Sequence, residues 1–307
     1  MKKTLIHSIV WLAIALVVVL FARALARDWD SVQDTILSMS WTSWWSVVFF
    51  VGAVVMSGVL WGVLVRHMSG REVPVADSVR IHAASWLLKY VPGQVGSLVN
   101  KIAWAKKHGH SKKTIATSVI YENILMVFAS VLLSLPLLLM FDVEIFNNST
   151  ILVALVAVVP MLVVANERVF YAILNKLLRL AKRQPLEGST LLSSRQILGN
   201  TIYYMAPRVI NGIGFVIIAA AMLPVTPDMY VPLASIFILA SVIGMLALFV
   251  PSGIGVREGI IVLLASVYFA PEQAIVLALV ARFFTTIADI GVALVYIILN
   301  KGRLIQK

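Results

Sequence analysis

Residues 78–105 read SVRIHAASWLLKYVPGQVGSLVNKIAWA, an apolar stretch that is broken at its centre. In the segment 91–96, VPGQVG, proline lacks a backbone donor and glycine disfavours the helix, so helical structure is expected to stop there. Each half has about 11–13 residues, or roughly 16–20 Å of helix at 1.5 Å per residue. Because the hydrocarbon core of a membrane is about 30 Å thick, neither half crosses it alone.

Basic residues flank this interrupted stretch on both sides. They are Arg66, Arg71 and Arg80 before it, and Lys106, Lys107, Lys112 and Lys113 after it. The positive-inside rule assigns both flanks to the cytoplasm, which predicts a re-entrant hairpin that leaves on the side where it entered.

The composition extends this reading to the whole chain. Of 307 residues, 61% are hydrophobic and only 13% are charged, where a soluble domain carries about a quarter charged residues. A soluble or secreted enzyme is thereby excluded. The net charge of +11 indicates membrane topology and contact with anionic lipid headgroups rather than nucleic acid. Cysteine is absent, which excludes disulfides and thiolate metal sites, and we expect no cofactor.

Several uninterrupted apolar runs are predicted to cross the membrane. They are residues 5–26, 45–65, 114–140, 150–165, 200–223 and 272–299. The basic stretch 168–183 is expected to lie on the inner surface as an amphipathic helix. The distribution of charge assigns both termini to the cytoplasm, as expected of a multi-pass protein of a bacterial inner or plasma membrane.

A second break, VPSGIGVRE at residues 250–258, is similar to the first. Setting Pro92 against Pro251 aligns two Val-Pro-x-x-Val/Ile-Gly segments, each followed by a short apolar helix, a turn and a long span. The segment 231–270 is either a re-entrant hairpin or a long helix with a short returning partner. Because the first unit enters from the cytoplasm and the second from outside, the pattern predicts an inverted repeat, in which paired broken helices mark a substrate site.

These observations predict one all-α polytopic integral membrane domain over residues 1–307. It has about six full spans plus two broken or re-entrant helical units. The predicted repeat units are about 78–140 and 231–299.

The two breaks also carry a family resemblance. The segments are KYVPGQVG at 89–96, G-x-S at 109–111, S-x-x-x-E at 118–122 and PSGIGVREG at 251–259. They resemble the transmembrane-region family of lysylphosphatidylglycerol synthase, the flippase-type domain of the multiple peptide resistance factor, from about residue 8 to 299. The resemblance implies an inner-membrane protein that moves an anionic or aminoacylated phospholipid, or a lipid-linked sugar, between leaflets. In the two-part synthase a soluble aminoacyl-transfer domain follows, whereas this chain stops at Lys307. We therefore do not expect this chain to synthesise the aminoacyl lipid.

Charged and polar residues within the apolar segments are candidate site residues, because an ionisable group at a helix centre costs about 2.5–3.5 kcal/mol. The candidate substrate-binding residues are Lys89, Pro92, Gly93, Gly96, Glu122, Asn123, Arg208, Pro251, Gly253, Gly255, Arg257, Glu258, Arg282 and Asp289.

Individual candidates have competing interpretations. Glu122 lies too deep in its span to reach either headgroup layer, and it falls one position from Arg282 in the repeat alignment. These opposite charges are expected to line one cavity and neutralise one another when it is empty. Arg282 suits a lipid phosphate or reaches outward to the interface. Arg257 suits a phosphate, whereas Glu258 suits a helix N-terminus. Arg208 follows a proline in mid-span and is expected in a polar cavity wall.

Two other polar residues, His82 and Lys101, are expected at the membrane interface.

Three function classes remain at this point. The first is a lipid flippase or scramblase without ATP hydrolysis, whose partners are membrane lipids. The second is an accessory or scaffold subunit that holds a cell-envelope glycosyltransferase or lipid-modifying enzyme. The third is an intramembrane transferase, which we do not expect because the chain shows no metalloprotease, P-loop, serine-hydrolase or Asp-rich metal motif. The buried charges favour the first class, and we expect the chain not to be an enzyme.

Overall fold

The computed structural model describes residues 29–90, 95–140, 166–180, 192–247 and 250–305. The described residues form helices joined by short turns, and no strand occurs among them. The α-helices are α2 (Trp29–Ser38), α3 (Trp45–Ser69), α4 (Val75–Leu87), α5 (Val95–Lys107), α6 (Lys112–Met140), α8 (Glu167–Leu180), α9 (Ser194–Met222), α10 (Tyr230–Leu246), α11 (Val256–Ala265) and α12 (Pro271–Ile305). Short 3-10 turns are η1 (Trp41–Trp44), η2 (Leu88–Tyr90), η6 (Pro227–Met229) and η7 (Pro251–Gly253).

Five segments in the described part of the chain are long and apolar enough to cross a membrane. They are Trp41–Ser69, Lys112–Leu135, Ser194–Met222, Pro227–Leu246 and Pro271–Lys301. The all-α polytopic fold class is therefore confirmed, as are the predicted spans at 45–65, 114–140, 200–223 and 272–299. The predicted spans at 5–26 and 150–165 lie outside the described residues.

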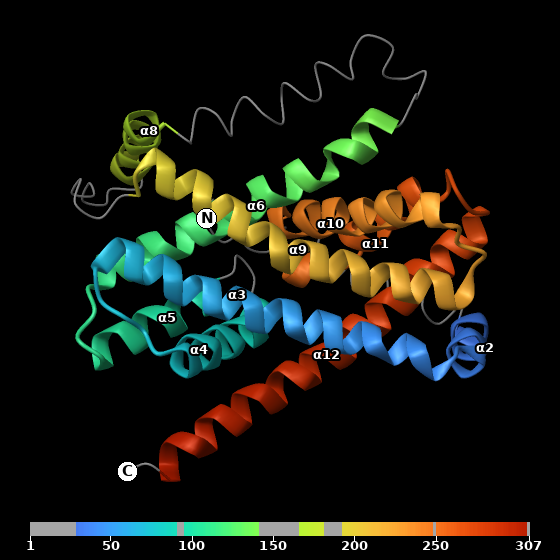
Figure 1. Cartoon of the computed structure of the whole chain (residues 1–307), viewed down its shortest axis with the longest axis horizontal. Helices are drawn as coiled ribbons and strands as arrows, with labels where there is room; N and C mark the ends of the chain where they lie inside the picture. The colour runs from blue at the N-terminus through green and yellow to red at the C-terminus, as the bar shows by residue number, and fades with distance from the viewer. Residues whose placement is uncertain (1–28, 91–94, 141–165, 181–191, 248–249, 306–307) are drawn as a thin grey trace, which may run out of the picture.

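Local sequence signals set the ends of these helices. Ser193 precedes α9 in a capping box. The Ser193 hydroxyl accepts from the Gln196 N–H, and the Gln196 side-chain oxygen accepts from the Ser193 N–H. Gly70 ends α3 in a left-handed conformation (φ 65°), where its N–H donates to the carbonyl of Arg66. Residues 168–180 of the predicted amphipathic segment 168–183 belong to α8, which lies beside the beginning of α9 (Figure 1), and residues 181–183 lie outside the described residues.

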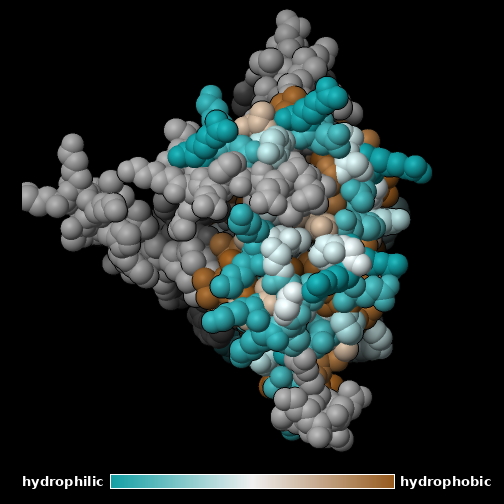
Figure 2. Space-filling view, turned by 90° about the vertical axis from the view of Figure 1, so that its left-hand side faces the viewer, coloured by the Kyte–Doolittle hydropathy of each residue, from teal (hydrophilic) through white to brown (hydrophobic). Residues whose placement is uncertain are grey.

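The first broken unit is the hairpin of α4, η2 and α5. It returns to the end where it began, because the Arg71 guanidinium before α4 donates to the Gly109 carbonyl after α5 at 2.9 Å. Figure 1 shows this end on the left, where α3 and α5 finish and α6 begins, and the last turns of α12 reach the same end. Figure 2 looks onto it and shows hydrophilic side chains gathered there. The predicted hairpin is confirmed, whereas the cytoplasmic location of its two flanks stays a prediction.

The second broken unit, formed by α10, η7 and α11, opens at the opposite end. Tyr268, just after α11, lies within electrostatic range of Asp228, just before α10. Residues at both its ends join one hydrophobic cluster with Val32 of α2, and Figure 1 shows α2 on the right, at the end of the molecule opposite α5. The two hairpins therefore open at opposite ends, as an inverted repeat requires. The division into repeat units stays a prediction.

The hairpins interlock through the long helices. Helix α4 packs against α12, and α10 packs against α6, so each hairpin lies on the long helix that follows the other. Their tips also touch, because η2 contacts η7. Helices α3 and α9 pack along one another and complete the bundle around this junction (Figure 1).

Candidate functional site

A cavity of about 190 Å³ lies where the two hairpins meet. Its wall takes residues from both hairpins, from the long helices α6 and α12, and from α3 and α9. Seven of the predicted site residues line it: Lys89, Glu122, Asn123, Arg208, Gly253, Arg257 and Asp289. The breaks and the membrane charges that the sequence singled out thus converge on one space.

The other predicted residues lie elsewhere. Gly96, Gly255, Glu258 and Arg282 are outside the lining. Pro92 and Gly93 lie outside the described residues, as does the side chain of Pro251. The expectation that Arg282 lines the cavity with Glu122 is therefore wrong: its side chain is engaged behind the wall, as shown below.

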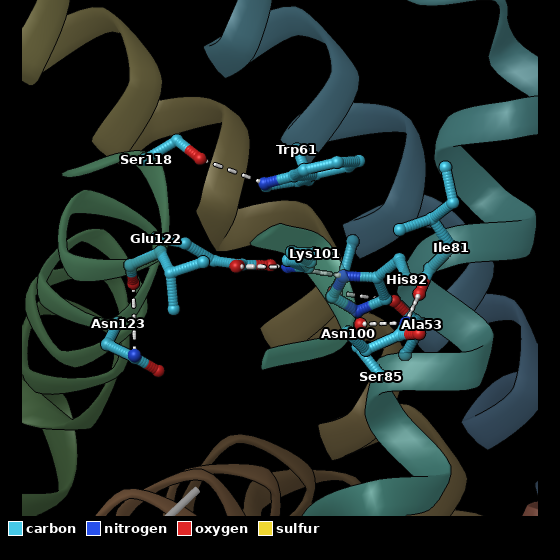
Figure 3. Close-up of polar contacts among 12 residues, drawn as sticks. Ala53, Trp61, Ile81, His82, Ser85, Asn100, Lys101, Ser118, Glu122 and Asn123 are labelled. Carbon is cyan, nitrogen blue, oxygen red and sulfur yellow. Dashed lines mark hydrogen bonds and ion pairs between the residues drawn. The ribbon is translucent and has the colours of Figure 1, made fainter. Parts of the chain in front are cut away.

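Glu122 is held by two basic side chains, each from a different helix of the first hairpin. Lys101 of α5 donates to Glu122 Oε2 at 2.5 Å, and His82 Nδ1 of α4 lies 3.1 Å from Glu122 Oε1. Figure 3 shows Lys101 between the other two groups, with the ring of Trp61 beside them. The ammonium lies 4.6 Å from that ring's centroid, and the indole N–H donates to Ser118 Oγ at 3.1 Å. In the interior, the Glu122 carboxylate therefore neutralises the Lys101 ammonium, and the face of the Trp61 ring adds a cation–π contact.

The placement of His82 and Lys101 at a membrane interface is wrong. The Lys101 side chain is only 1% exposed and that of Glu122 only 4%, and His82 is also buried. The helical spacing could have predicted the burial of Lys101, because Lys101 shares one face of α5 with the buried Trp104 and Ala105 at spacings of three and four. That face turns inward because α5 packs on α4 and α6.

A second cluster stands behind the tip of the other hairpin. Glu258 lies in the first turn of α11, where its Oε2 accepts from the Gly255 N–H at 2.6 Å. Its Oε1 lies 3.5 Å from Arg257 Nε and 3.6 Å from Arg282 Nη1. Glu258 is therefore both the helix cap that its position predicted and the partner of two arginines. Arg282 is 9% exposed, so outward reach to the interface is excluded.

The two clusters correct the expected pairing of Glu122 with Arg282. Each is neutralised within its own unit, Glu122 by Lys101 on the short helix before it and Arg282 by Glu258 on the short helix before it. The order of charge is reversed between the units: cation then acid in the first, acid then cation in the second. The repeat alignment brought together two corresponding positions that are not in contact.

The backbone of η7 approaches α10 closely at the cavity wall. Ser252 and Gly253 of η7, and Gly255 just after it, all have positive φ, of 54°, 64° and 82°. A Cβ at Gly253 would lie 2.8 Å from the backbone of Gly244 in α10, closer than real side chains come. Glycine at this position lets the break fold back onto α10 and puts Arg257 at the wall, where its Nη2 donates to Thr285 Oγ1 at 3.0 Å.

Among the described residues, an ion pair on the cavity wall joins the two units. Lys89 of η2 donates to Asp289 Oδ1 of α12 at 2.7 Å, and the same oxygen accepts from the Trp86 indole at 2.8 Å. Both charged side chains are more exposed than those of Lys101 and Glu122. The interaction lies on the wall and connects η2 directly with α12.

Arg208 differs from the other charged residues of the cavity wall in its lack of an ion-pair partner among the described residues. It lies on α9 after Pro207, is 8% exposed and lines the cavity. No carboxylate lies within ion-pair distance of it in the described part of the chain, and its buried Nε has no hydrogen-bond partner there. The prediction of a polar cavity wall at Arg208 is confirmed, and the guanidinium is available to an anion.

The cavity can therefore hold an anionic or polyhydroxylated group inside an apolar bundle, with cations, hydroxyls and amides on its wall. In the comparisons with known proteins, the family model described as Lysylphosphatidylglycerol synthase TM region matches residues 10–293. No curated protein matches the chain.

Proposed function

Since the chain belongs to the Lysylphosphatidylglycerol synthase TM region family, we propose that it translocates a lipid between membrane leaflets without ATP hydrolysis. The headgroup of a phospholipid or lipid-linked sugar enters the cavity between the hairpins while the acyl or prenyl tails stay in the bilayer. The observation that carries this proposal is the charged cavity at the junction of two broken helices that open at opposite ends of the bundle.

The energetics of the wall support a role for the cavity. Lys89, Arg208, Arg257 and Asp289 line it, and each charge within a membrane bundle costs about 2.5–3.5 kcal/mol on insertion scales. Helix packing alone does not require such groups, since small residues and apolar side chains suffice for it. Groups that are costly to bury and that face a common space favour contact with a polar substrate.

The same wall supports a transport role rather than a catalytic one, and we propose that the chain is not itself an enzyme. Both carboxylates of the described wall are held by cations, Glu122 by Lys101 and Asp289 by Lys89. A carboxylate neutralised in this way is a weak base, whereas general-base catalysis needs one poised to accept a proton.

We further propose a bacterial inner or plasma membrane location with both termini in the cytoplasm. The end of the molecule that carries the loops around Arg71 and Gly109 is hydrophilic (Figure 2), and α12 finishes at that end (Figure 1). Positive charge near the ends of spans favours the cytoplasmic side.

The test is a leaflet-resolved assay in proteoliposomes with a panel of fluorescent phospholipids and polyprenyl-linked sugars. Ser241 of α10 lines the cavity, whereas Leu263 of α11 is 67% exposed on the outer surface. We expect wild type and Leu263→Trp to accelerate translocation of at least one lipid, and Ser241→Trp to fall to the protein-free rate because the ring fills the cavity. Protein-free rates for wild type with every lipid, or full activity in Ser241→Trp, would contradict the proposal and favour the scaffold.

A further inference from the structure

The geometry points to a lipid with a net anionic phosphate headgroup as the cavity's ligand, with Arg208 as its phosphate receptor. This inference rests on the proposed function and narrows it, because a headgroup made cationic by an aminoacyl substituent is disfavoured. Three features of the described wall carry the argument: its charge balance, the engagement of its carboxylates and the donors along α9.

The cavity wall carries excess positive charge. The cations that line it are Lys89, Lys101, Arg208 and Arg257, and the carboxylates are Glu122 and Asp289. Four cations against two carboxylates leave an excess of two positive charges. Behind the wall, Glu258 and Arg282 contribute one charge of each sign and leave the balance unchanged. Because the surroundings are apolar and little screened, this excess attracts anions and repels a cationic headgroup.

The carboxylates are not free to receive an ammonium group. Glu122 Oε2 accepts from Lys101, and Glu122 Oε1 lies 3.1 Å from His82 Nδ1 without a hydrogen bond in the described chain. Asp289 Oδ1 accepts from both Lys89 and the Trp86 indole. A lysyl or alanyl headgroup would have to displace one of these cations and leave it buried without its partner, which is strongly unfavourable.

Arg208, in contrast, presents donors with nothing to accept from them. Tyr204, Arg208 and Asn211 follow one another at spacings of four and three, so they share one face of α9. Tyr204 Oη and Arg208 Nε are both buried without a hydrogen-bond partner in the described chain. Arg208 and Asn211 also line the cavity. Phosphate oxygens are the acceptors that a guanidinium binds in bidentate geometry.

Neutral polar groups also line the cavity. They include the hydroxyls of Ser85, Ser97 and Ser241 and the amides of Asn123 and Asn211. Hydroxyls and amides both donate and accept, so they suit the hydroxyls of a glycerol or sugar attached to the phosphate. The wall as a whole therefore complements one phosphate with an uncharged polyol better than a phosphate that carries an amine.

The test is direct binding to the purified full-length protein in detergent, measured by native mass spectrometry and calorimetry. The probes are dioctanoyl phosphatidylglycerol, phosphatidylcholine and lysylphosphatidylglycerol, together with tail-free glycerol 3-phosphate. We expect affinity in the order anionic, zwitterionic, cationic, and at least tenfold weaker binding of glycerol 3-phosphate because it lacks tails. Arg208→Gln is expected to weaken phosphatidylglycerol binding by about tenfold or more, as loss of a charged hydrogen bond implies, and to reduce the preference for anionic lipid.

Arg195 provides the matched control, since it is exposed near the beginning of the same helix. Arg195→Gln removes an equal charge and should leave the affinities unchanged, while Arg208→Lys should recover part of the lost selectivity. Three results would overturn the inference: wild-type affinity in Arg208→Gln, tightest binding of the lysyl lipid, or equal affinity for glycerol 3-phosphate. If binding follows the expected order but no lipid crosses in proteoliposomes, the proposed function fails while the anionic site stands.

Discussion

Removing the acid of the Lys101–Glu122 pair should destabilise the protein more than removing any exposed charge. The two side chains are 1% and 4% exposed and 2.5 Å apart. In Glu122→Gln, the Lys101 ammonium keeps an amide oxygen as acceptor, with His82 Nδ1 at 3.4 Å and the Trp61 ring beside it, but it loses its buried counter-charge. Breaking a buried pair in this way costs about 3–5 kcal/mol, which corresponds to a fall in Tm of about 6–20 °C at roughly 2–4 °C per kcal/mol.

The structure also predicts how the double substitution behaves. Lys101→Met alone should cost less than Glu122→Gln, because Glu122 then keeps His82 at 3.1 Å as a partner. Lys101→Met with Glu122→Gln should recover most of the lost stability, since neither residue is left as an uncompensated charge.

The assay is thermal unfolding of detergent-purified variants, followed by tryptophan fluorescence and by the fraction that stays monodisperse after heating. The control is the exposed pair of Arg66 and Glu72, 3.3 Å apart with side chains 63% and 76% exposed. Glu72→Gln should cost at most about 1 kcal/mol. Equal Tm values for Glu122→Gln and Glu72→Gln would contradict the mutual compensation of the buried pair. A fall in Tm of the double variant equal to the sum of the falls in the two single variants would contradict it as well.

Two further predictions concern the breaks. Gly253→Ala should lower both Tm and the translocation rate, because its Cβ would lie 2.8 Å from the α10 backbone and φ is 64°. The control Gly259→Ala, whose Cβ would meet nothing within 4 Å, should leave translocation unchanged and Tm unchanged or slightly raised. Equal effects of the two substitutions would show that the tip is not tightly packed. Single cysteines at Glu72 and Lys112 in this cysteine-free chain should react with an impermeant maleimide from the same side of sealed vesicles, and one at Asp228 from the other side; labelling of the first two from opposite sides would exclude the re-entrant path.

Much of the fold was predictable because hydrophobic length and helix breaks are local properties of a chain. The break at 91–96 and its basic flanks fixed the hairpin, and the structure returns it to its starting end. Pairing was not predictable in the same way. Lys101 has the composition of an interfacial residue, and only the packing of α5 against α4 and α6 buries it. Two further spans and the tip residues Pro92 and Gly93 lie outside the described residues, so those predictions stay open.

The sequence predicted which residues belong to the candidate site better than it predicted which of them contact one another. Arg208 was placed in a cavity wall because a charge after a mid-span proline needs polar surroundings, and it lies there. Glu122 and Arg282 were matched to one another because they occupy almost equivalent repeat positions. A repeat alignment identifies positions related by symmetry, and such positions need not touch. Each of these residues instead takes its partner from the short helix that precedes it.

The distribution of charge separates the part of the bundle that holds itself together from the part that is available to a ligand. The Lys101–Glu122 and Glu258–Arg282 contacts each lie within one unit, so they are kept when one unit shifts relative to the other. Lys89 and Asp289 join the units, and such a shift would have to separate them. Arg208 comes from α9, outside both units, and has no partner in the described chain. The other cations of the cavity wall have carboxylate partners, so Arg208 is the charge that neither unit neutralises and that is available to a ligand.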